Sequence, residues 1–207
     1  MVENKDILSE VKNYYDKKLS LYGNTSQGVD WNSVESQVLR FEQLTKVIRC
    51  CKKTSLNDLG CGHGDYYYYL TNNFDKIEYE GIDVSQDMVD LAHDKFPEAD
   101  FICSSKPSKI RDYTIASGIF NVRQSRSDDE WWAYFTRTLD IMDSHSELGF
   151  AFNCLTSFSD IEKRKAYLYY ADPMKVFEYC KKKYSRNVAL LHDYDLYEFT
   201  IIIRKDK

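Results

Sequence analysis

Three of the eight glycines in this 207-residue chain, Gly60, Gly62 and Gly64, fall within five consecutive positions of the segment "LNDLGCGHGD". Glycine has no Cβ, so a bend built from it lets a ligand approach the backbone closely. If a helix begins directly after the bend, its first amide groups face that ligand. The segment therefore predicts a site for a nucleotide-like ligand at the carboxyl ends of the strands.

The residues around this bend narrow the class of ligand. A dinucleotide fingerprint would need glycine at position 65, but the chain has Asp65, whose carboxylate repels a pyrophosphate. A phosphate-binding P-loop is also excluded, because no Gly-Lys-Ser or Gly-Lys-Thr follows. Asp58 suits a ligand that carries a cationic group and no phosphate. Asp83 closes the next predicted strand, where an acidic side chain can accept hydrogen bonds from both hydroxyls of a ribose.

The elements that must hold these residues alternate between strands and helices. Five strands are predicted, at 55–59, 79–84, 99–103, 113–118 and 148–153. Helices are predicted at 4–18, from Val34 to about Cys51, through the tyrosines 66–69, after Ser85, after Ser127 and at 172–182. The closing segment "NVALLHDYDLYEFTIIIR" is typical of a hairpin. This order predicts an α/β fold: a mostly parallel sheet with helices on both faces and a C-terminal antiparallel hairpin.

Apolar spacing indicates which face of each helix is buried. On the helix that starts at Val34, the predicted buried stripe is Val34, Val38, Phe41, Leu44 and Ile48. The helix after Ser127 opens with a capping box and is expected to turn inward Trp132, Phe135, Leu139 and Met142. Tyr66 to Tyr69 point around most of a helix, so some should pack against the sheet and others meet solvent.

Composition and charge exclude several classes of protein. The net charge of -5 and the pI near 5.4 argue against a protein that coats nucleic acid or an anionic membrane. The first residues, "MVENKDILSE", are charged and no apolar run approaches the roughly 20 residues of a membrane span, so we expect a cytoplasmic protein. The six cysteines lack C-x-x-C spacing, which favours reduced, buried thiols and no metal site. We expect a monomer or homodimer with no nucleic acid or membrane partner.

The segments "LNDLGCGHGD" and "YEGIDVSQDMVDLA" together resemble the first two motifs of class I, Rossmann-like S-adenosylmethionine-dependent methyltransferases. The resemblance covers most of the chain from about residue 34 and implies a seven-stranded sheet that ends in an antiparallel hairpin. It implies S-adenosylmethionine as cofactor, with its methionine end on Gly60, Cys61, Gly62 and Gly64. It also places Asp58 near the amino-acid group, Asp83 at the ribose, and Val84 and Met88 beside the adenine.

Other parts of the chain meet the family pattern less closely. Many relatives carry an acidic residue after the third strand, whereas this chain has "ICSSKPS", so Ser104 or Ser105 is the expected polar contact to the adenine. Ser117 and Gly118 lie at the end of the predicted fourth strand, where the family meets cofactor and substrate. The [DN]PP[YF] motif of base-amino methyltransferases is missing. The resemblance further divides the single domain, 1–207, into an N-terminal helix and lid-like segment, 1–33, and a core, 34–207, with a substrate-side insertion at 154–171.

Histidine is the natural general base near neutral pH, and four are present. The candidates are His192, beside Asp193 in the hairpin turn, and His145, before the fifth strand. Each can also be an ordinary turn or loop residue. His63 is expected to fill the bend, and His93 is expected to face solvent. Arg123 follows the fourth strand and can bind an anionic substrate or form a surface ion pair.

These observations favour transfer of a methyl group from S-adenosylmethionine to an oxygen, less so a nitrogen, of a small acceptor such as a sugar or another polar metabolite. In the N-terminal segment, Trp31 and Arg40 are candidates for ligand contact. In the segment 154–171, the candidates for acceptor contact are Tyr167, Tyr169 and Tyr170. Two alternatives stay open: a cofactor-binding scaffold or regulator without catalysis, and a protein or RNA methyltransferase.

Overall fold

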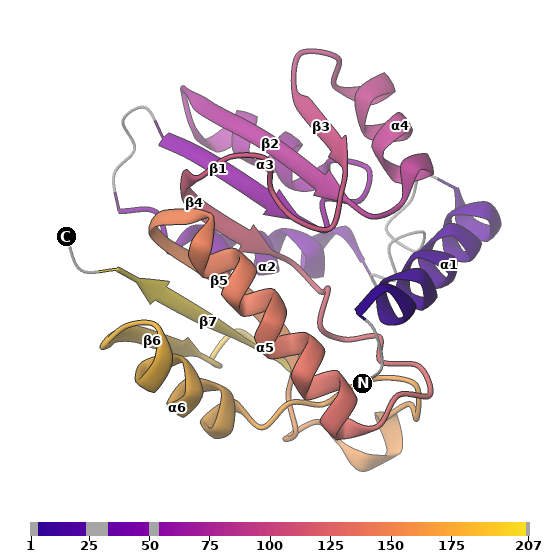
Figure 1. The fold of residues 1–207 in the computed structure, drawn as a ribbon, viewed down its shortest axis with the longest axis vertical. Helices are drawn as coiled ribbons and strands as arrows, with labels where there is room; N and C mark the ends of the chain where they lie inside the picture. The colour runs from indigo at the N-terminus through magenta and orange to yellow at the C-terminus, as the bar shows by residue number, and fades with distance from the viewer. Residues whose placement is uncertain (1–3, 24–32, 50–53, 206–207) are drawn as a thin grey trace.

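A seven-stranded sheet forms the centre of the molecule (Figure 1). The structure is a computed structural model, and it describes residues 4–23, 33–49 and 54–205. The strands lie in the order β3-β2-β1-β4-β5-β7-β6. Their bounds are β1 Thr54–Leu59, β2 Ile77–Asp83, β3 Asp100–Cys103, β4 Arg111–Ala116, β5 Ser146–Leu155, β6 Asn187–Leu191 and β7 Glu198–Arg204.

Strands β1 to β5 pair in parallel, whereas β7 pairs antiparallel with both β5 and β6. The predicted fold class, hairpin included, is therefore confirmed. Glu198 at the start of β7 lies opposite Leu155 at the end of β5. The turn between β6 and β7 consequently sits at the carboxyl edge of the parallel strands, the edge where α/β proteins bind their ligands.

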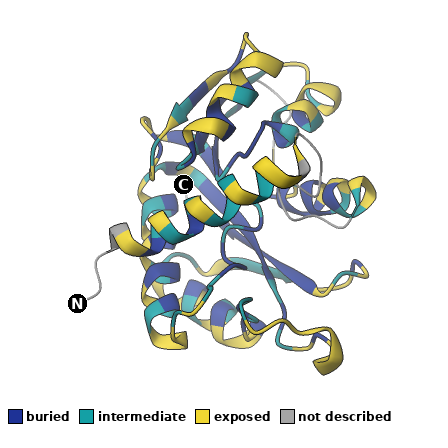
Figure 2. Cartoon of the chain, turned by 90° about the vertical axis from the view of Figure 1, so that its right-hand side faces the viewer, coloured by how far each residue is buried: buried dark blue, intermediate teal, exposed yellow. Residues whose placement is uncertain are grey.

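Helices cover both faces of this sheet, and their outward sides are exposed (Figures 1 and 2). One apolar core joins α1, α5 and α6 to the sheet, and the other core joins α2, α3 and α4 to it. The helix starts follow the predicted caps: Ser85 accepts from the Met88 amide, and Ser127 with Glu130 forms a capping box. The helix bounds are α1 Asn4–Tyr22, α2 Val34–Thr45, α3 Asp65–Asn73, α4 Gln86–Lys95, α5 Asp128–Ser144, η2 Ile161–Lys163 and α6 Pro173–Lys183.

Helix α2 differs from its prediction in length and in orientation. It ends at Thr45 and not near Cys51, because the amide of Lys46 bonds back to the Gln43 and Leu44 carbonyls and tightens the last turn. Val34 and Val38, predicted to be buried, are 61% and 36% exposed. The side of α2 that turns inward over its first turns is polar, namely Gln37, Arg40 and Gln43. The reason lies in distant partners, which are described with the site below.

In α5, Trp132 was predicted to be buried, but its neighbour Trp131 is the buried tryptophan. Trp131 is 1% exposed, and its indole N–H donates to the Phe120 carbonyl at 3.0 Å. Trp132 is only partly buried and stacks on Phe135. Apolar spacing could not decide which of these two adjacent tryptophans is buried, because burial depends on which indole N–H finds an acceptor.

The tyrosine run and the cysteines mostly follow expectation. Tyr66 is 2% exposed and Tyr68 is 59% exposed, while the two tyrosines between and after them are half-buried, as the prediction required. Among the described cysteines, which are all free thiols, Cys103 is exposed, contrary to the prediction, and the other three are buried. Cys50 and Cys51 lie outside the described residues. Within the described ranges, no helix has both the length and the apolar character that a membrane crossing needs.

Candidate cofactor site and acceptor cavity

The glycine bend joins the end of β1 to the start of α3. Gly60, Gly62 and Gly64 all have positive φ, at 80°, 52° and 87°. Such angles strain any residue with a side chain. At Gly60, a Cβ would lie 2.2 Å from Cγ2 of Ile119, and at Gly64 it would press against the ring of Phe96. Glycine is therefore needed here for the backbone conformation of the bend as well as for the close approach of a ligand.

Asp83 ties this bend to the next helix. Its Oδ2 accepts from the Gly62 amide at 3.0 Å, and its Oδ1 accepts from the Ser85 amide at 2.9 Å. A carboxylate offers about four acceptor positions, so each oxygen can accept a further hydrogen bond. Burial raises the pKa of Asp83, and the backbone donors oppose that rise. The side chain faces the bend and is not turned out into water.

Asp58, near the end of β1, is the second buried carboxyl at this edge. It is 1% exposed and accepts a hydrogen bond from the Tyr79 hydroxyl at 2.7 Å. Burial raises the pKa of Asp58 to about 7, against the hydrogen bond from Tyr79, which lowers it. A cationic group beside it would favour the ionised form.

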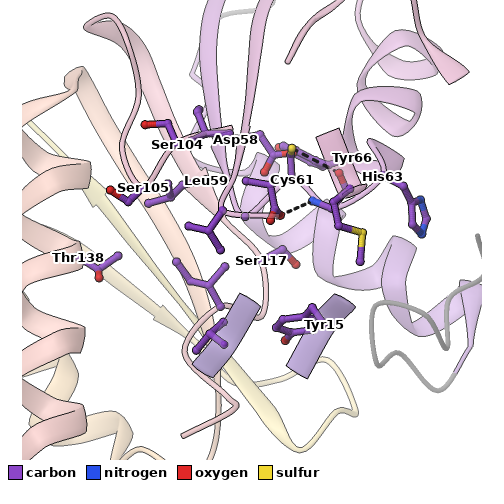
Figure 3. A pocket seen from close by; sticks show the side chains of 18 of the residues that line it. Tyr15, Asp58, Leu59, Cys61, His63, Tyr66, Ser104, Ser105, Ser117 and Thr138 are labelled. Atoms are coloured by element: carbon purple, nitrogen blue, oxygen red, sulfur yellow. Dashed lines mark hydrogen bonds between the residues drawn. The ribbon is translucent and has the colours of Figure 1, made fainter. Parts of the chain in front are cut away.

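A cavity, the bend cavity, opens at this edge (Figure 3). Helix α1 covers it with Leu8, Val11 and Tyr15, and α5 contributes Tyr134 and Thr138. Gly64 and Gly118 do not line it. The residues predicted to bind cofactor that do line it are Asp58, Gly60, Cys61, Gly62, Asp83, Val84, Met88, Ser104 and Ser117.

Polar side chains also line the bend cavity beside the first turn of α3. Asp65 accepts from Gln37 Nε2 at 3.0 Å and from Lys95 Nζ at 2.8 Å, and His63 Nδ1 lies 3.2 Å away. Burial would raise the pKa of Asp65, but the contacts with His63 and Lys95 outweigh it and hold that pKa below its usual range. His63 is 3% exposed and fills the bend, as predicted, but its Nε2 has no hydrogen-bond partner among the residues that the structure describes.

A second cavity, the hairpin cavity, lies between α1, α2, the loop after β4, the segment 159–170 and the β6–β7 turn. Tyr15 lines both cavities. Ser117 lines the bend cavity, and the next residue, Gly118, lines the hairpin cavity. The two cavities are therefore adjacent, and Tyr15 and the backbone at 117–118 form their shared border. The polar residues of the hairpin cavity are Tyr15, Arg40, Asn121, Ser159, Lys163, Lys165, Tyr170, Asp195, Tyr197 and Glu198.

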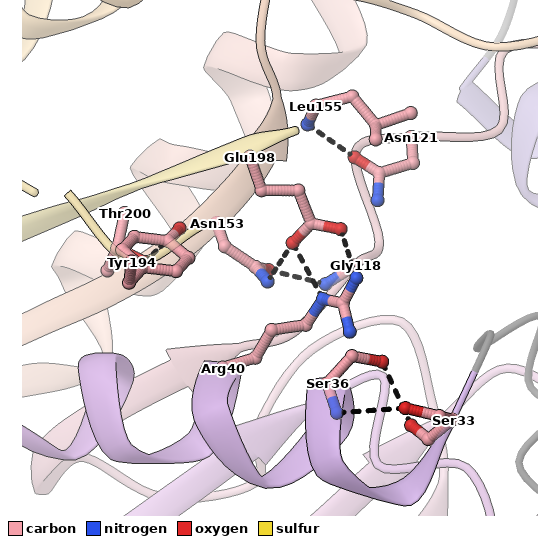
Figure 4. Close-up of polar contacts among 10 residues, drawn as sticks. All are labelled: Ser33, Ser36, Arg40, Gly118, Asn121, Asn153, Leu155, Tyr194, Glu198 and Thr200. Carbon is pink, nitrogen blue, oxygen red and sulfur yellow. Dashed lines mark hydrogen bonds and ion pairs between the residues drawn. The ribbon is translucent and has the colours of Figure 1, made fainter. Parts of the chain in front are cut away.

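A buried polar chain supports the hairpin cavity (Figure 4). Arg40 on α2 donates twice to Glu198 on β7, through Nε at 2.8 Å and Nη2 at 2.7 Å. Asn153 Nδ2 donates to the same carboxylate at 2.9 Å, and Asn153 Oδ1 accepts from the Gly118 amide at 2.7 Å. Arg40 and Glu198 are 5% and 3% exposed. Their pairing explains why the polar side of α2 turns inward.

Two of the three candidate acceptor-side residues lie at the correct edge of the sheet but outside both cavities. His192 is exposed in the β6–β7 turn, with its ring 6.0 Å from that of Phe158. Arg123 is bound to Asp128 and donates to the Ala166 carbonyl at 3.5 Å. Neither His192 nor Arg123 is among the described residues that line the two cavities.

The placement of His145 contradicts its candidacy as a base. It caps the end of α5, its Nδ1 bonds to the Ile141 carbonyl at 2.8 Å, and its own carbonyl accepts from the amide of Arg111 at the start of β4. The starts of parallel strands share one edge, which is the edge opposite the bend. Trp31 lies outside the described residues. Glu198, by contrast, was missed, because nothing local distinguishes it from an ordinary first residue of a strand.

A parallel sheet with a glycine bend after β1 and an acidic residue at the end of β2 defines a protein that binds an adenosine-containing cofactor at its carboxyl edge. The model of the methyltransferase domain family matches residues 57–145. A Mycobacterium tuberculosis protein named as a methyltransferase, Rv1506c, is 50% identical over 163 residues, which are 77% of this chain and 98% of the relative. The chain belongs to the class I S-adenosylmethionine-dependent methyltransferases, and S-adenosylmethionine is its cofactor.

Solved structures show the same fold at low sequence identity. The magnesium protoporphyrin IX methyltransferase of Synechocystis PCC 6803 with bound S-adenosylmethionine has a TM-score of 0.63 at 14% identity, covering 100% of this chain and 99% of that one. The plantazolicin methyltransferase BpumL, in complex with a pentazolic substrate analogue and S-adenosylhomocysteine, has a TM-score of 0.60 at 13% identity, covering 99% and 100%.

Proposed function

We propose that this enzyme methylates an oxygen of a small polar acceptor held in the hairpin cavity. The observation that carries the proposal is the shared border of the two cavities at Tyr15 and the backbone at 117–118. A methyl group passes only between adjacent sites, and the hairpin cavity borders the bend cavity.

The residues of the bend fit the cofactor. Bare backbone at Gly60 and Gly62 leaves room for the methionine end, Asp58 answers a cationic amino group, and Asp83 has acceptor positions left for the ribose. Ser117 adds a buried hydroxyl with no partner among the described residues. Val84, Met88 and Ser104 would then face the adenine from the other end of the same cavity.

The raised pKa of Asp58 predicts that cofactor affinity depends on pH. Below pH 7 the free protein holds a proton on Asp58, whose pKa is raised to about 7, but an ammonium group beside it favours the carboxylate. Affinity for S-adenosylhomocysteine should therefore rise with pH by about tenfold per unit up to pH 7, with release of a proton. Titration calorimetry at pH 5.5 to 8, in buffers of different ionisation enthalpy, measures both.

The same shift affects the stability of the free protein with the opposite sign. Between pH 4 and pH 7 the folded state retains a proton that the unfolded chain, with an Asp pKa near 3.8, has lost. The free energy of unfolding should therefore fall as pH rises through this range. Asp58→Asn should remove this contribution and flatten the binding profile. A wild-type affinity that is constant from pH 5.5 to 8 would contradict the placement of Asp58 beside the amino group.

When bound, S-adenosylmethionine supplies an electrophilic methyl group on a sulfonium. A hydroxyl acceptor would form the new C–O bond with an oxygen lone pair while the methyl C–S bond breaks, which would leave S-adenosylhomocysteine and a proton from the hydroxyl. The walls of the hairpin cavity therefore need mainly to hold the acceptor in line. None of the four histidines supplies a side chain to that cavity. Alignment, with a proton that leaves to solvent or to a weak acceptor, is therefore the favoured source of acceleration.

The walls favour a neutral, hydroxyl-rich acceptor. Arg40 is paired with Glu198, and Lys163 is paired with Asp160 and donates a hydrogen bond to the Tyr197 hydroxyl. Tyr170 and Tyr197 line this cavity among polar groups, a combination that suits a sugar. A cation covers one face of each ring, Arg164 over Tyr170 and Lys163 over Tyr197, so a sugar would pack on the other face. Two enzymes of the same fold are named for magnesium protoporphyrin IX and for plantazolicin, so the fold itself does not select a sugar, and an amine or a peptide stays the second candidate class.

The proposal can be tested with labelled cofactor and grouped acceptors. The enzyme with methyl-deuterated S-adenosylmethionine should label neutral glycosides or polyols as methyl ethers. Tyr170→Leu should raise the acceptor KM about tenfold through lost ring contact, while the Kd of S-adenosylhomocysteine changes less than twofold. Label that enters only amines, peptide or RNA, or an acceptor KM untouched by Tyr170→Leu, would overturn the assignment.

A further inference from the structure

One side chain borders both cavities from α1. Tyr15 lines the bend cavity (Figure 3), together with Leu8 and Val11. It also lines the hairpin cavity, together with Arg40. At the same border Ser117 lines the bend cavity and Gly118 lines the hairpin cavity. A methyl group that passes from one cavity to the other must therefore pass beside Tyr15.

Both sides of this border are held in place. The Gly118 amide is bound to Asn153, which is bound in turn to the buried Glu198. On the other side, α1 is bound to the core at two points that flank Tyr15. Glu10 pairs with Arg126 at 2.6 and 3.0 Å, and Asp16 accepts from the Ser85 hydroxyl at 2.5 Å.

An aromatic ring in this position has a definite electrostatic preference. The face of a tyrosine ring attracts a cation by about 0.5–2 kcal/mol, and most strongly where water is excluded. The cofactor carries its positive sulfonium only before transfer, and the demethylated product is neutral at sulfur. A ring beside the departing methyl therefore distinguishes the two.

We propose that Tyr15 is a cofactor-binding residue whose ring faces the methyl sulfonium at the border of the two cavities, so that it favours S-adenosylmethionine over S-adenosylhomocysteine. This inference rests on the proposed function, because it places the methyl group at the mouth of the hairpin cavity. The ring, and not the hydroxyl, carries the preference. Tyr15→Phe should therefore retain it and Tyr15→Leu should lose it.

The test is a ratio of two dissociation constants, which requires no acceptor. Titration calorimetry with S-adenosylmethionine and with S-adenosylhomocysteine gives this ratio for the wild type, Tyr15→Phe and Tyr15→Leu. In Tyr15→Leu, the affinity for S-adenosylmethionine should fall about 3- to 20-fold more than the affinity for S-adenosylhomocysteine. In Tyr15→Phe, the ratio should stay within twofold of the wild type.

Tyr14→Leu provides the matched control, because Tyr14 is the neighbouring ring on α1, 5.2 Å from Tyr15, and is not among the residues that line either cavity. It should leave the ratio unchanged. If Tyr15→Leu weakens the affinity for both ligands equally, Tyr15 only lines the cavity and does not contact the sulfonium, and the proposal is overturned. Failure of the acceptor assignment appears separately, as a KM that Tyr170→Leu does not move.

Discussion

Asp83→Ala is expected to weaken S-adenosylhomocysteine binding at least 100-fold. The two carboxylate oxygens already accept from the Gly62 and Ser85 amides, and the remaining lone pairs lie in the bend cavity for the ribose hydroxyls. Two charge-assisted hydrogen bonds at about 1.5–3 kcal/mol each correspond to a loss of two or more orders of magnitude. Titration calorimetry measures the affinity directly.

Asp83→Asn separates the contribution of charge from that of shape. The amide keeps the size of the carboxylate, but its nitrogen cannot accept from either backbone N–H. We expect an intermediate loss of affinity and, in the free protein, a lower free energy of unfolding by about 1–3 kcal/mol for both variants. Binding within threefold of wild type in Asp83→Ala would show that the ribose is held elsewhere.

The bend and Asp83 could be predicted because their geometry is local. Positive φ values at Gly60, Gly62 and Gly64 and the cap at Ser85 arise from residues adjacent in sequence. The carboxyl ends of neighbouring parallel strands then bring the two motifs together without further information. His145 could have been excluded by the same reasoning, because a residue that precedes a parallel strand lies at the opposite edge.

The acceptor side could not be predicted in this way. Arg40 and Glu198 are 158 positions apart, and neither has a sequence neighbour that announces the pairing. Apolar spacing placed Val34 and Val38 inward, but the buried ion pair fixed the rotation of α2 and left them exposed. Where a polar contact between distant segments sets a helix face, periodicity within the helix is a poor guide.

This ion pair carries the second large effect. Glu198→Ala should lower the free energy of unfolding by about 3–5 kcal/mol, because it leaves the Arg40 guanidinium buried without its carboxylate. It also removes the acceptor of Asn153, which positions Gly118. Urea unfolding of wild type and variant gives the difference.

The matched control replaces both partners. A buried ion pair gains little net stability over apolar side chains of similar size, because desolvation offsets its attraction. Arg40→Met with Glu198→Leu should therefore recover most of the stability that Glu198→Ala loses and still bind S-adenosylhomocysteine. It should fail to bind acceptor normally, since Gly118 and the polar wall of the hairpin cavity lose their anchor. If the double variant keeps the wild-type KM for the acceptor, the ion pair stabilises the fold and has no role in acceptor binding. If Glu198→Ala lowers the free energy of unfolding by less than about 1 kcal/mol, water reaches the ion pair.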